Sequence, residues 1–520
     1  MKYEIKLLKD ECFYGGSSYY GLENPFDENS NFEMDMNVMT INQTMPLFVS
    51  NKGRYVWSDN AFAFKFHNGV LEIEGKDVEV VCSGTTLKEA YLSAMNKHFK
   101  FDGRELPKEY FMTAQYCTWM EHIYFPSQEK VLKYAHDIID NGLEPGILII
   151  DEGWHGRYGD WEFDFYKFPN PKQMVDELHV LGFKVLLWIV PWVCPDGYTF
   201  VRNATEDERI KTKNSGKIFI KNKQGEVGLF SWWNGFSAML DLRNPYAAEF
   251  LDEQLQHLIK DYGVDGFKFD GGQARHYGYL INGELSDDTD IHAMNIAWNE
   301  FGRRYEYHEY KDTYLGGGKN CIQRLSDRAS DWHYANKGLD TIIPCSILQG
   351  LLGHPFICPD MIGGGSWDYA QNPNFVVDQE LFVRASQISA LFPMMQFSWA
   401  PWRVLSKENF EYVKKSAKLH KEMADEIYTL VKKSYVSGEP IVRALEYNYP
   451  NQGYEKIQDQ YMVGEDILVA PVTTPKTYSK NVVIPKGIWK AYDGTIYEGG
   501  KTVCMETPLH SLVWFRKISD

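Results

Sequence analysis

The spacing of hydrophobic positions changes twice along the chain. Residues 1–105 alternate apolar and polar positions, and Asn68-Gly69 separates two such runs, which is typical of a β-hairpin. This part predicts a β-sandwich that ends in a helix over residues 86–98. From residue 106 short apolar runs alternate with helical patterns, which indicates a parallel sheet. After residue 430 the two-residue period returns and predicts a second β domain.

The middle part predicts a series of strands joined by helices. The expected strands lie at 111–119, 146–151, 184–191 and within 262–272, and the expected helices at 128–141, 171–181 and 245–260. In a β/α barrel the carboxyl ends of the strands meet on one face, and that face carries the chemistry. Acidic and aromatic residues follow these strands and are expected to share that face. They include Asp151, Glu152, Trp154, Trp188 and Trp192.

Length and charge narrow the class of protein. The chain has 520 residues, which is too many for one hydrophobic core and predicts two or three domains. Its formal net charge of -17 argues against nucleic acid or an anionic membrane as a partner. No apolar run approaches the ~20 residues that span a bilayer. Charged residues interrupt the first ten positions, so we expect no secretory signal and a cytoplasmic protein.

The cysteines and glycines give no sign of a cofactor. The eight cysteines lie far apart, without a Cys-x-x-Cys pair or paired histidines. This spacing predicts free thiols in a reducing compartment and no zinc site. A phosphate-binding glycine loop is also missing from the sequence. We therefore expect neither a metal nor an organic cofactor.

Asp270 stands at the end of the strand within 262–272 and is followed by two glycines. An acid in this place often caps the next helix. Lys268 favours a second interpretation, because residues two apart on a strand share a face. A lysine near a carboxylate keeps the carboxylate ionised and can donate to sugar hydroxyls. The pair therefore predicts a sugar-binding site at the barrel mouth.

Four segments carry the strongest motifs: 267–273 (Phe-Lys-Phe-Asp-Gly-Gly-Gln), 324–332 (Arg-Leu-Ser-Asp-Arg-Ala-Ser-Asp-Trp), 359–365 (Pro-Asp-Met-Ile-Gly-Gly-Gly) and 466–472 (Asp-Ile-Leu-Val-Ala-Pro-Val). Together they resemble glycoside hydrolase family 31, whose members are retaining α-glycosidases. They are most similar to the branch related to the myogenesis-regulating glycosidase, which prefers galactose. The resemblance covers about residues 110–490.

The resemblance implies both a fold and a mechanism. The implied fold is α/β, with an N-terminal β-sandwich at 1–105, a (β/α)8 TIM barrel at 106–430 and a C-terminal β-sandwich at 431–520. In the implied double displacement Asp270 is the nucleophile and Asp327 the acid/base, because retaining hydrolysis needs an ionised and a protonated carboxyl about 5 Å apart. Asp331 is the alternative for the second role.

The resemblance also suggests residues that bind the sugar. Asp151 matches a family acid that binds hydroxyls of the innermost sugar, although an acid there could instead cap the next element. Trp233 matches a sugar-stacking ring, with a buried core tryptophan as the alternative. The full set of candidate substrate-binding residues is Asp151, Glu152, Trp154, Trp188, Trp233, Lys268, Arg324, Trp332 and Asp360.

Four positions around the acids refine this set. Arg324 or Arg328 could hold a catalytic carboxyl charged, and the resemblance supports Arg324. Asp360 could bind substrate or orient Arg324. Ser398 stands where mainstream α-glucosidases carry a histidine that binds a substrate hydroxyl. The glucose contacts of those enzymes are therefore not expected in this chain.

These features lead us to expect an exo-acting, retaining α-glycosidase for a terminal α-linked hexose. An α-galactoside is the first choice, because the Lys-x-Asp pair also resembles the nucleophile strand of related α-galactosidases. An α-glucosidase or a transglycosylase is the alternative, and a carbohydrate-binding protein without turnover is a third. The expected partner is a small-molecule or oligosaccharide α-glycoside, and the chain could form a homo-oligomer.

Overall fold

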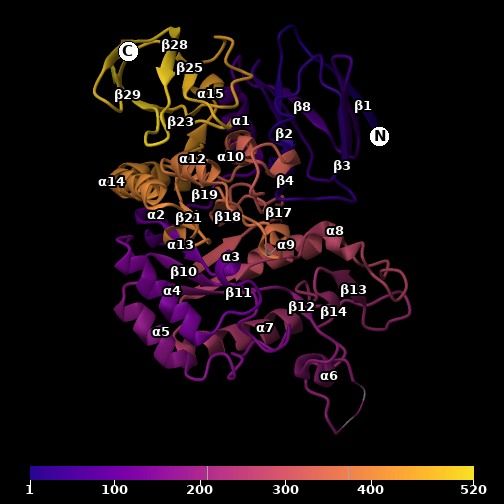
Figure 1. Ribbon diagram of the computed structural model, residues 1–520. Coiled ribbons are helices and arrows are strands. Elements are labelled where there is room, and N and C mark those ends of the chain that lie inside the picture. Colours follow the sequence, from indigo (N-terminus) through magenta and orange to yellow (C-terminus); the bar gives the residue numbers. More distant parts are fainter. Residues whose placement is uncertain (206, 208, 373, 520) are drawn as a thin grey trace.

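The structure is a computed structural model that describes residues 1–205, 207, 209–372 and 374–519. A parallel β/α barrel forms one half of the molecule, and two β domains from the two ends of the chain lie together on one side of the barrel (Figure 1). The two β domains touch, because Tyr14 Oη donates to Glu455 O over 2.8 Å. The predicted fold class is confirmed.

The N-terminal domain is a sandwich of two sheets. One sheet has the order β1 (Lys2–Lys6), β7 (Val70–Glu74), β6 (Ala63–His67), β3 (Phe32–Asp35), and the other β17 (Thr313–Tyr314), β4 (Gln43–Ser50), β5 (Arg54–Trp57), β8 (Glu79–Cys82), with β2 (Phe13–Ser17) also paired to β4. Strands β6 and β7 form the hairpin predicted at Asn68-Gly69. The ring of Phe48 packs 4.9 Å from that of Phe64, so aromatic contacts join the two sheets.

Within the described part of the chain the barrel has eight strand positions, all parallel. In order around the barrel they are β9 (Gln115–Cys117), β10 (Ile147–Ile150), β11 (Lys184–Ile189), β15 (Gly266–Phe269), β16 (Tyr307–Tyr310), β18 (Ile322–Arg324), β19 with β20 (Ile357–Cys358 and Met361–Ile362) and β21 (Gln396–Phe397). Strand β19 pairs with β18 and strand β20 with β21. Only Pro359 and Asp360 separate β19 from β20, so this one stretch of chain closes the barrel.

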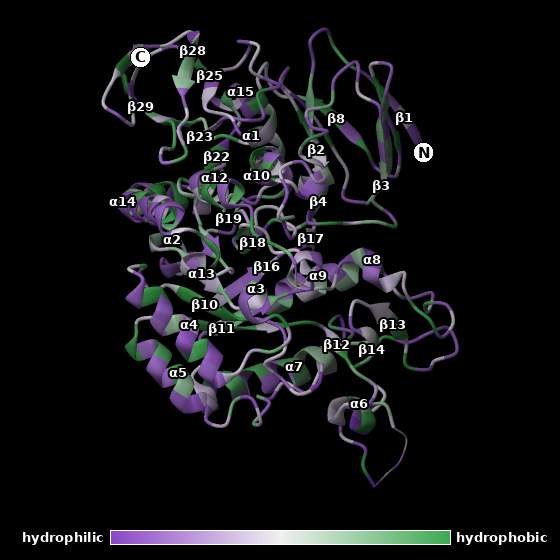
Figure 2. Cartoon of the chain, viewed as in Figure 1, coloured by the Kyte–Doolittle hydropathy of each residue, from purple (hydrophilic) through white to green (hydrophobic). Residues whose placement is uncertain are grey.

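Helices cover the outside of the strands. They include α4 (Gln128–Asp140), α5 (Pro171–Val180), α7 (Pro245–His257), α9 (Ile291–Gly302), α10 (Ile342–Leu351) and α12 (Gln379–Ser389). In α4, Ser127 caps the first turn, and Val131, Tyr134, Ala135 and Ile138 form the buried face at helical spacing. Strand β10 is hydrophobic throughout, whereas α4 and α5 have mixed surfaces (Figure 2).

Two predicted element boundaries differ from the structure. The first strand is shorter than the predicted 111–119, because the chain there starts as helix α2 (Glu109–Met112). Helix α7 ends at His257 and continues as a π-turn, η2 (Leu258–Tyr262). The domain boundary at 431 stays a prediction; helix α14 (Lys407–Ser437) spans that position and ends at left-handed Gly438.

The C-terminal domain packs a large sheet on a two-stranded one. The large sheet has the order β22 (Val442–Arg443), β23 (Tyr461–Val463), β24 (Ile467–Val469), β29 (Trp514–Ser519), β26 (Ile488–Ala491), β27 (Ile496–Glu498), and the small sheet pairs β25 (Ser479–Ile484) with β28 (Lys501–Glu506). Leu468, Val482, Trp489 and Phe515 belong to the core between them. Within the described residues no helix is both long and apolar enough to cross a membrane.

Candidate active site

A cavity of about 420 Å³ opens at the carboxyl ends of the barrel strands. Its volume lies within the ~300–1,000 Å³ of small-molecule sites. The residues that line it are Trp119, Tyr124, Asp151, Glu152, Trp188, Trp233, Lys268, Asp270, Gln273, Arg275, Lys311, Asp327, Lys337, Met361, Ser366, Trp367 and Asp368. The cavity thus brings together Asp270, Asp327 and five of the candidate binding residues.

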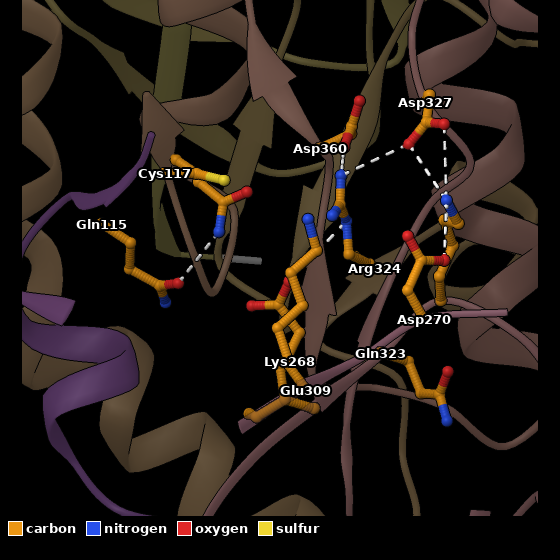
Figure 3. Close-up of polar contacts among 12 residues, drawn as sticks. Gln115, Cys117, Lys268, Asp270, Glu309, Gln323, Arg324, Asp327 and Asp360 are labelled. Atoms are coloured by element: carbon orange, nitrogen blue, oxygen red, sulfur yellow. Dashed lines mark hydrogen bonds and ion pairs between the residues drawn. The ribbon is translucent and has the colours of Figure 1, made fainter. Parts of the chain in front are cut away.

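Asp270 directly follows β15 and faces the cavity with a side chain that is 11% exposed. Its Oδ2 accepts from Trp188 Nε1 over 3.1 Å, and its Oδ1 accepts from Gly271 N over 2.8 Å. These contacts fix the orientation of the carboxylate. Figure 3 shows Asp270 beside Asp327 and Arg324.

The two glycines after Asp270 are required by space and by backbone conformation. Gly271 and Gly272 both have φ of +68°. A Cβ on Gly271 would lie 2.1 Å from the ring of Trp192, and one on Gly272 would lie 2.5 Å from the ring of Trp298. Side chains at either position would therefore displace the turn that presents Asp270.

Lys311 joins the two carboxylates. It directly follows β16, and its Nζ lies 3.0 Å from Asp270 Oδ1 and 3.3 Å from Asp327 Oδ1. Those two distances limit the separation of the two carboxylate oxygens to at most about 6.3 Å. Carboxyl groups stand ~5–5.5 Å apart in retaining glycosidases and ~6.5–9.5 Å apart in inverting ones. The geometry therefore fits the retaining class.

The charges around the two acids set their ionisation in the free site. Burial alone would raise the pKa of Asp270, but Lys311 and Lys268 outweigh burial and hold this pKa well below its ordinary value. Burial also acts upward on Asp327, and Lys311 and Arg324 bring its pKa below the ordinary value. Both carboxyls are therefore ionised near neutral pH before substrate binds.

Lys268 forms a buried ion pair with Asp151 in the floor of the cavity. Its Nζ donates to Asp151 Oδ2 over 2.6 Å, and both side chains are 4% exposed. The thiol of Cys117 donates to the same oxygen over 3.0 Å. Although Lys268 contributes to the low pKa of Asp270, the cation in direct contact with Asp270 is Lys311.

Glu152 lies beside this pair and is held in a neutral form. Burial raises its pKa to about 8. Its Oε1 accepts from Tyr158 Oη over 2.7 Å and from Asn234 Nδ2. A neutral carboxyl can donate a hydrogen bond as well as accept one. Glu152 can therefore serve a sugar hydroxyl as a donor.

The predicted tryptophans fall into two groups. Trp188 and Trp233 line the cavity, and Trp233 presents a ring that is 46% exposed. Trp154 is fully buried, and its Nε1 donates to Trp188 O over 2.7 Å. Trp332 is also buried, and its Nε1 donates to Asp378 Oδ2 over 2.9 Å. Trp154 and Trp332 thus pack behind the site and lie outside the lining of the cavity.

Arg324 is the cation behind Asp327. It ends β18 and forms an ion pair with Asp360, while its Nη2 lies 3.6 Å from Asp327 Oδ1 (Figure 3). Arg324 and Asp360 are both buried and outside the cavity lining, so they are placed to orient Asp327. The guanidinium of Arg328 instead donates to Ser326 O and Thr341 Oγ1.

Two further positions lie outside the cavity. Asp331, the alternative acid, is exposed, and its Oδ1 accepts from His333 N over 2.9 Å. Ser398 is fully buried, and its Oγ accepts from Met120 N over 2.7 Å. Of the two acids considered for the proton donor, the structure therefore brings Asp327 to Asp270.

Sequence reasoning missed Lys311, the residue that contacts both acids. Its strand, β16, reads Tyr-His-Glu-Tyr and is buried on both faces, so it lacks the alternation or the apolar run that marks a strand. The signal that could have found it is a lysine and an acid, Lys311-Asp312, just after a short aromatic run. Among the described residues no group of three or more metal-ligating side chains forms a metal site.

A closed parallel barrel whose strand ends present two carboxylates this close together is the arrangement of retaining glycoside hydrolases. The chain matches the family model for the glycosyl hydrolases family 31 TIM-barrel domain over residues 104–430, and that for the family's C-terminal domain over 438–518. It therefore belongs to glycosyl hydrolase family 31.

Individual relatives agree with this family. The chain is 30% identical over 444 residues to the mouse myogenesis-regulating glycosidase, covering 82% of this chain and 59% of the relative. It is 25% identical over 423 residues to alpha-glucosidase 2 of Bacillus thermoamyloliquefaciens, covering 76% of this chain and 51% of the relative. The chain thus spans between half and three fifths of these relatives.

Solved structures share the fold. A family 31 dextranase of Flavobacterium johnsoniae, complexed with glucose, superposes with a TM-score of 0.82 at 20% identity. The superposition covers 99% of this chain and 66% of the dextranase. At this identity the likeness establishes the architecture, including both β domains.

Proposed function

We propose that this protein is an exo-acting, retaining α-glycosidase that removes a terminal α-linked hexose from a small glycoside or an oligosaccharide. One observation carries the proposal: Asp270 and Asp327 share Lys311 at the barrel mouth, with their oxygens at most about 6.3 Å apart. Membership of family 31 supports the same reaction class.

In the first step Asp270 attacks the anomeric carbon. The low pKa of Asp270 keeps the attacking oxygen ionised, and Trp188 and Gly271 hold it in place. The bond from C1 to the leaving oxygen breaks as the bond from C1 to Asp270 forms. Asp327 gives a proton to the leaving oxygen, which departs as an alcohol.

In the second step Asp327 takes a proton from water, which attacks C1 and releases Asp270. The side chain of Asp327 is 38% exposed in the free site, so water reaches it. A bound glycoside displaces that water, and loss of water raises the pKa of a carboxyl. Binding itself therefore moves Asp327 toward the protonated form that the first step needs.

The floor of the cavity supports action at a chain end. Asp151, Glu152, Trp188 and Lys268 close the inner side and are each at most 3% exposed. A single sugar can fill the space between this floor and Asp270, whereas a continuing chain has no exit through the barrel core. The hydroxyl-binding groups of the floor are charged or polar, as recognition of a hexose requires.

We infer an α-galactoside as the preferred substrate, with an α-glucoside as the alternative. Lys268 precedes the nucleophile by two positions, as in related α-galactosidases, and it lines the cavity. Ser398 stands at the position of the glucosidase histidine. It is buried, and its Oγ accepts a hydrogen bond from Met120 N. Groups built to bond an axial hydroxyl penalise the epimer, because buried partners are left unpaired.

A panel of 4-nitrophenyl α-glycosides tests the proposal. We expect kcat/KM for the α-galactoside to exceed that for the α-glucoside by more than about a hundredfold, on the order of 3 kcal/mol. Lys268→Met should lower this ratio as well as the rate. Proton NMR should show the α-anomer as the first sugar released. A preference for the glucoside would overturn the sugar assignment, and a first product of β configuration would overturn the retaining mechanism.

The same panel separates hydrolysis from transglycosylation. A transglycosylase uses the same two carboxylates but passes the sugar to an acceptor. With added galactose or glucose as acceptor, a hydrolase releases monosaccharide in proportion to 4-nitrophenol. If less monosaccharide than 4-nitrophenol were released and new disaccharide made up the difference, the enzyme would be a transglycosylase.

A further inference from the structure

The cations at the cavity differ in what they contact. Lys268 pairs with Asp151, Lys311 pairs with the two catalytic acids, and Arg324 pairs with Asp360 behind the cavity. Arg275 and Lys337 also line the cavity, yet within the described residues neither side chain has an ion-pair or hydrogen-bond partner. The Nε of Arg275 is buried and lacks an acceptor. Both side chains can therefore donate to a ligand in the cavity without breaking an existing contact.

The two unpartnered cations lie on the side of Asp327. Burial lowers the pKa of Lys337, Asp327 raises it, and Lys311, Arg328 and Arg275 lower it further. Lys337 therefore lies near Asp327 and Arg275, and we call the part of the cavity that these three residues line its outer end. The nearby acids already contact other groups: Asp327 contacts Lys311 and Arg324, and Asp312, on which Arg275 acts, accepts from Gln273. The chain as a whole carries a net charge of -17, so this positive region is not a general property of its surface.

We propose that the outer end of the cavity binds an oxyanion carried by the leaving group of the substrate, held by Arg275 and Lys337. This inference rests on the proposed function, because Asp327 protonates the leaving oxygen and so marks the leaving-group side. The guanidinium of Arg275 offers a planar pair of donors, and Lys337 adds a point charge. A carboxylate or a phosphate monoester has the oxygens to accept from both.

The rest of the rim fits a sugar as the leaving group. Trp233 and Trp367 line the cavity with rings that are 46% and 43% exposed, and ring faces suit the apolar side of a pyranose. The one acid on the outer rim besides Asp327, among the lining residues, is Asp368, which is exposed. An exposed acid is hydrated and competes weakly with a ligand for Arg275, which is only partly exposed. The leaving group is thus a sugar acid or a sugar phosphate.

Three α-galactosyl disaccharides test this assignment. Their leaving groups are glucose, glucuronate and glucose 6-phosphate, joined through the same hydroxyl. At low ionic strength we expect kcat/KM of the wild type for at least one charged substrate to exceed that for the neutral one by about tenfold or more. A preference for the glucuronate assigns a carboxylate, and a preference for the phosphate assigns a phosphate ester. Equal or lower values for both charged substrates overturn the inference while leaving the glycosidase standing.

Variants test whether Arg275 and Lys337 cause the preference for charged substrates. The double substitution Arg275→Gln with Lys337→Gln should bring the charged-to-neutral ratio close to one. The control Lys133→Gln removes an exposed cation on the outer helix α4, and it should keep the wild-type ratio. The wild-type ratio alone already decides the inference, so it stays testable if the double variant fails to fold. An unchanged ratio in a folded double variant overturns the assignment to Arg275 and Lys337.

A binding measurement separates this inference from the proposed reaction. Calorimetric titration with glucuronate, glucose 6-phosphate and glucose needs no turnover. We expect at least one charged sugar to bind about tenfold or more tightly than glucose, with the difference lost in the double variant. Equal affinities would contradict the anion site even in an active enzyme. Anion binding without turnover of any α-glycoside would overturn the proposed function and leave an anionic sugar as the ligand.

Discussion

Lys311 contacts both carboxylates, so one positive charge acts on both steps of the reaction. It lowers the pKa of Asp270, which must be ionised to attack, and of Asp327, which must be protonated to donate. The first effect favours catalysis near neutral pH, and the second opposes it in the free site. The pH dependence of kcat/KM reports both groups in the free enzyme.

Replacing Lys311 by Met should move the whole pH profile of kcat/KM to higher pH. Removal of a cation raises the pKa of a neighbouring carboxyl, so the acidic limb set by Asp270 and the alkaline limb set by Asp327 both shift upward. A contact of 3.0–3.3 Å predicts a shift of about one pH unit or more. Profiles measured with 4-nitrophenyl α-galactoside check this, with Lys133→Met on α4 as the control. A profile that keeps its position would contradict the shared role.

Replacing Asp327 by Ala should lower kcat/KM for substrates with poor leaving groups far more than for activated substrates. Only a poor leaving group needs the proton, so kcat/KM for a disaccharide should fall by about 10²-fold or more relative to that for a dinitrophenyl glycoside. Asp331→Ala is the matched control, because Asp331 lies exposed outside the cavity. This variant should change kcat/KM little for either substrate. Equal losses on both substrates for Asp327→Ala would remove the proton-donor role from Asp327.

At the scale of elements, the N-terminal domain holds the loops that carry the catalytic groups. Gln43, at the start of β4, donates from Nε2 to Lys311 O over 3.0 Å and to Arg324 O over 3.1 Å. Asn42 Nδ2 donates to Lys311 O over 2.9 Å, and Asn42 Oδ1 accepts from Ser326 N over 3.0 Å. The loop after β16 contains β17, which pairs with β4 in place of a barrel helix. The sandwich therefore positions Lys311 and Asp327.

Replacing Gln43 by Met should lower kcat by about tenfold or more with little change in KM, because displaced loops misplace Lys311 and Asp327. Thr44→Val is the control: Thr44 is equally buried, and its side-chain Oγ1 donates to Ile41 O, within the N-terminal domain. Both variants should lose stability in thermal unfolding, but only Gln43→Met should lose kcat. Equal kcat in the two variants would show that the sandwich has no part in positioning the site.

The barrel strands and the residues that follow them were the elements most easily predicted from the sequence. Apolar runs at 146–151 and 184–191 contain β10 and β11, and the acid after β10 reached the cavity as Asp151. Motif position alone did not show which side of the backbone a ring takes, so Trp154 and Trp332 were placed in the site although they pack behind it. Both tryptophans lie in loops after strands, where the alternation of a strand no longer fixes the direction of a side chain.

At the scale of the molecule, three parts were predictable because the hydrophobic period changes between them. The closure of the barrel was not predictable from the sequence. It runs through Ile357–Cys358 and Met361–Ile362, and each half of that strand has only two residues. The parallel pairing of β17 with β4, which joins positions about 270 residues apart, was not predictable either. The cavity depends on such long-range contacts, so the sequence located its acids but not the cation between them.

The central claim is that Asp270 forms a covalent bond to the sugar. A galactosyl fluoride with an additional ring fluorine forms this intermediate and slows its release, so the adduct can be found by mass spectrometry of protein fragments. We expect one fluorogalactosyl unit per chain, on the peptide that contains Asp270, and none in the Asp270→Asn variant. A label on another residue, or turnover to the β-anomer without any adduct, would contradict the mechanism.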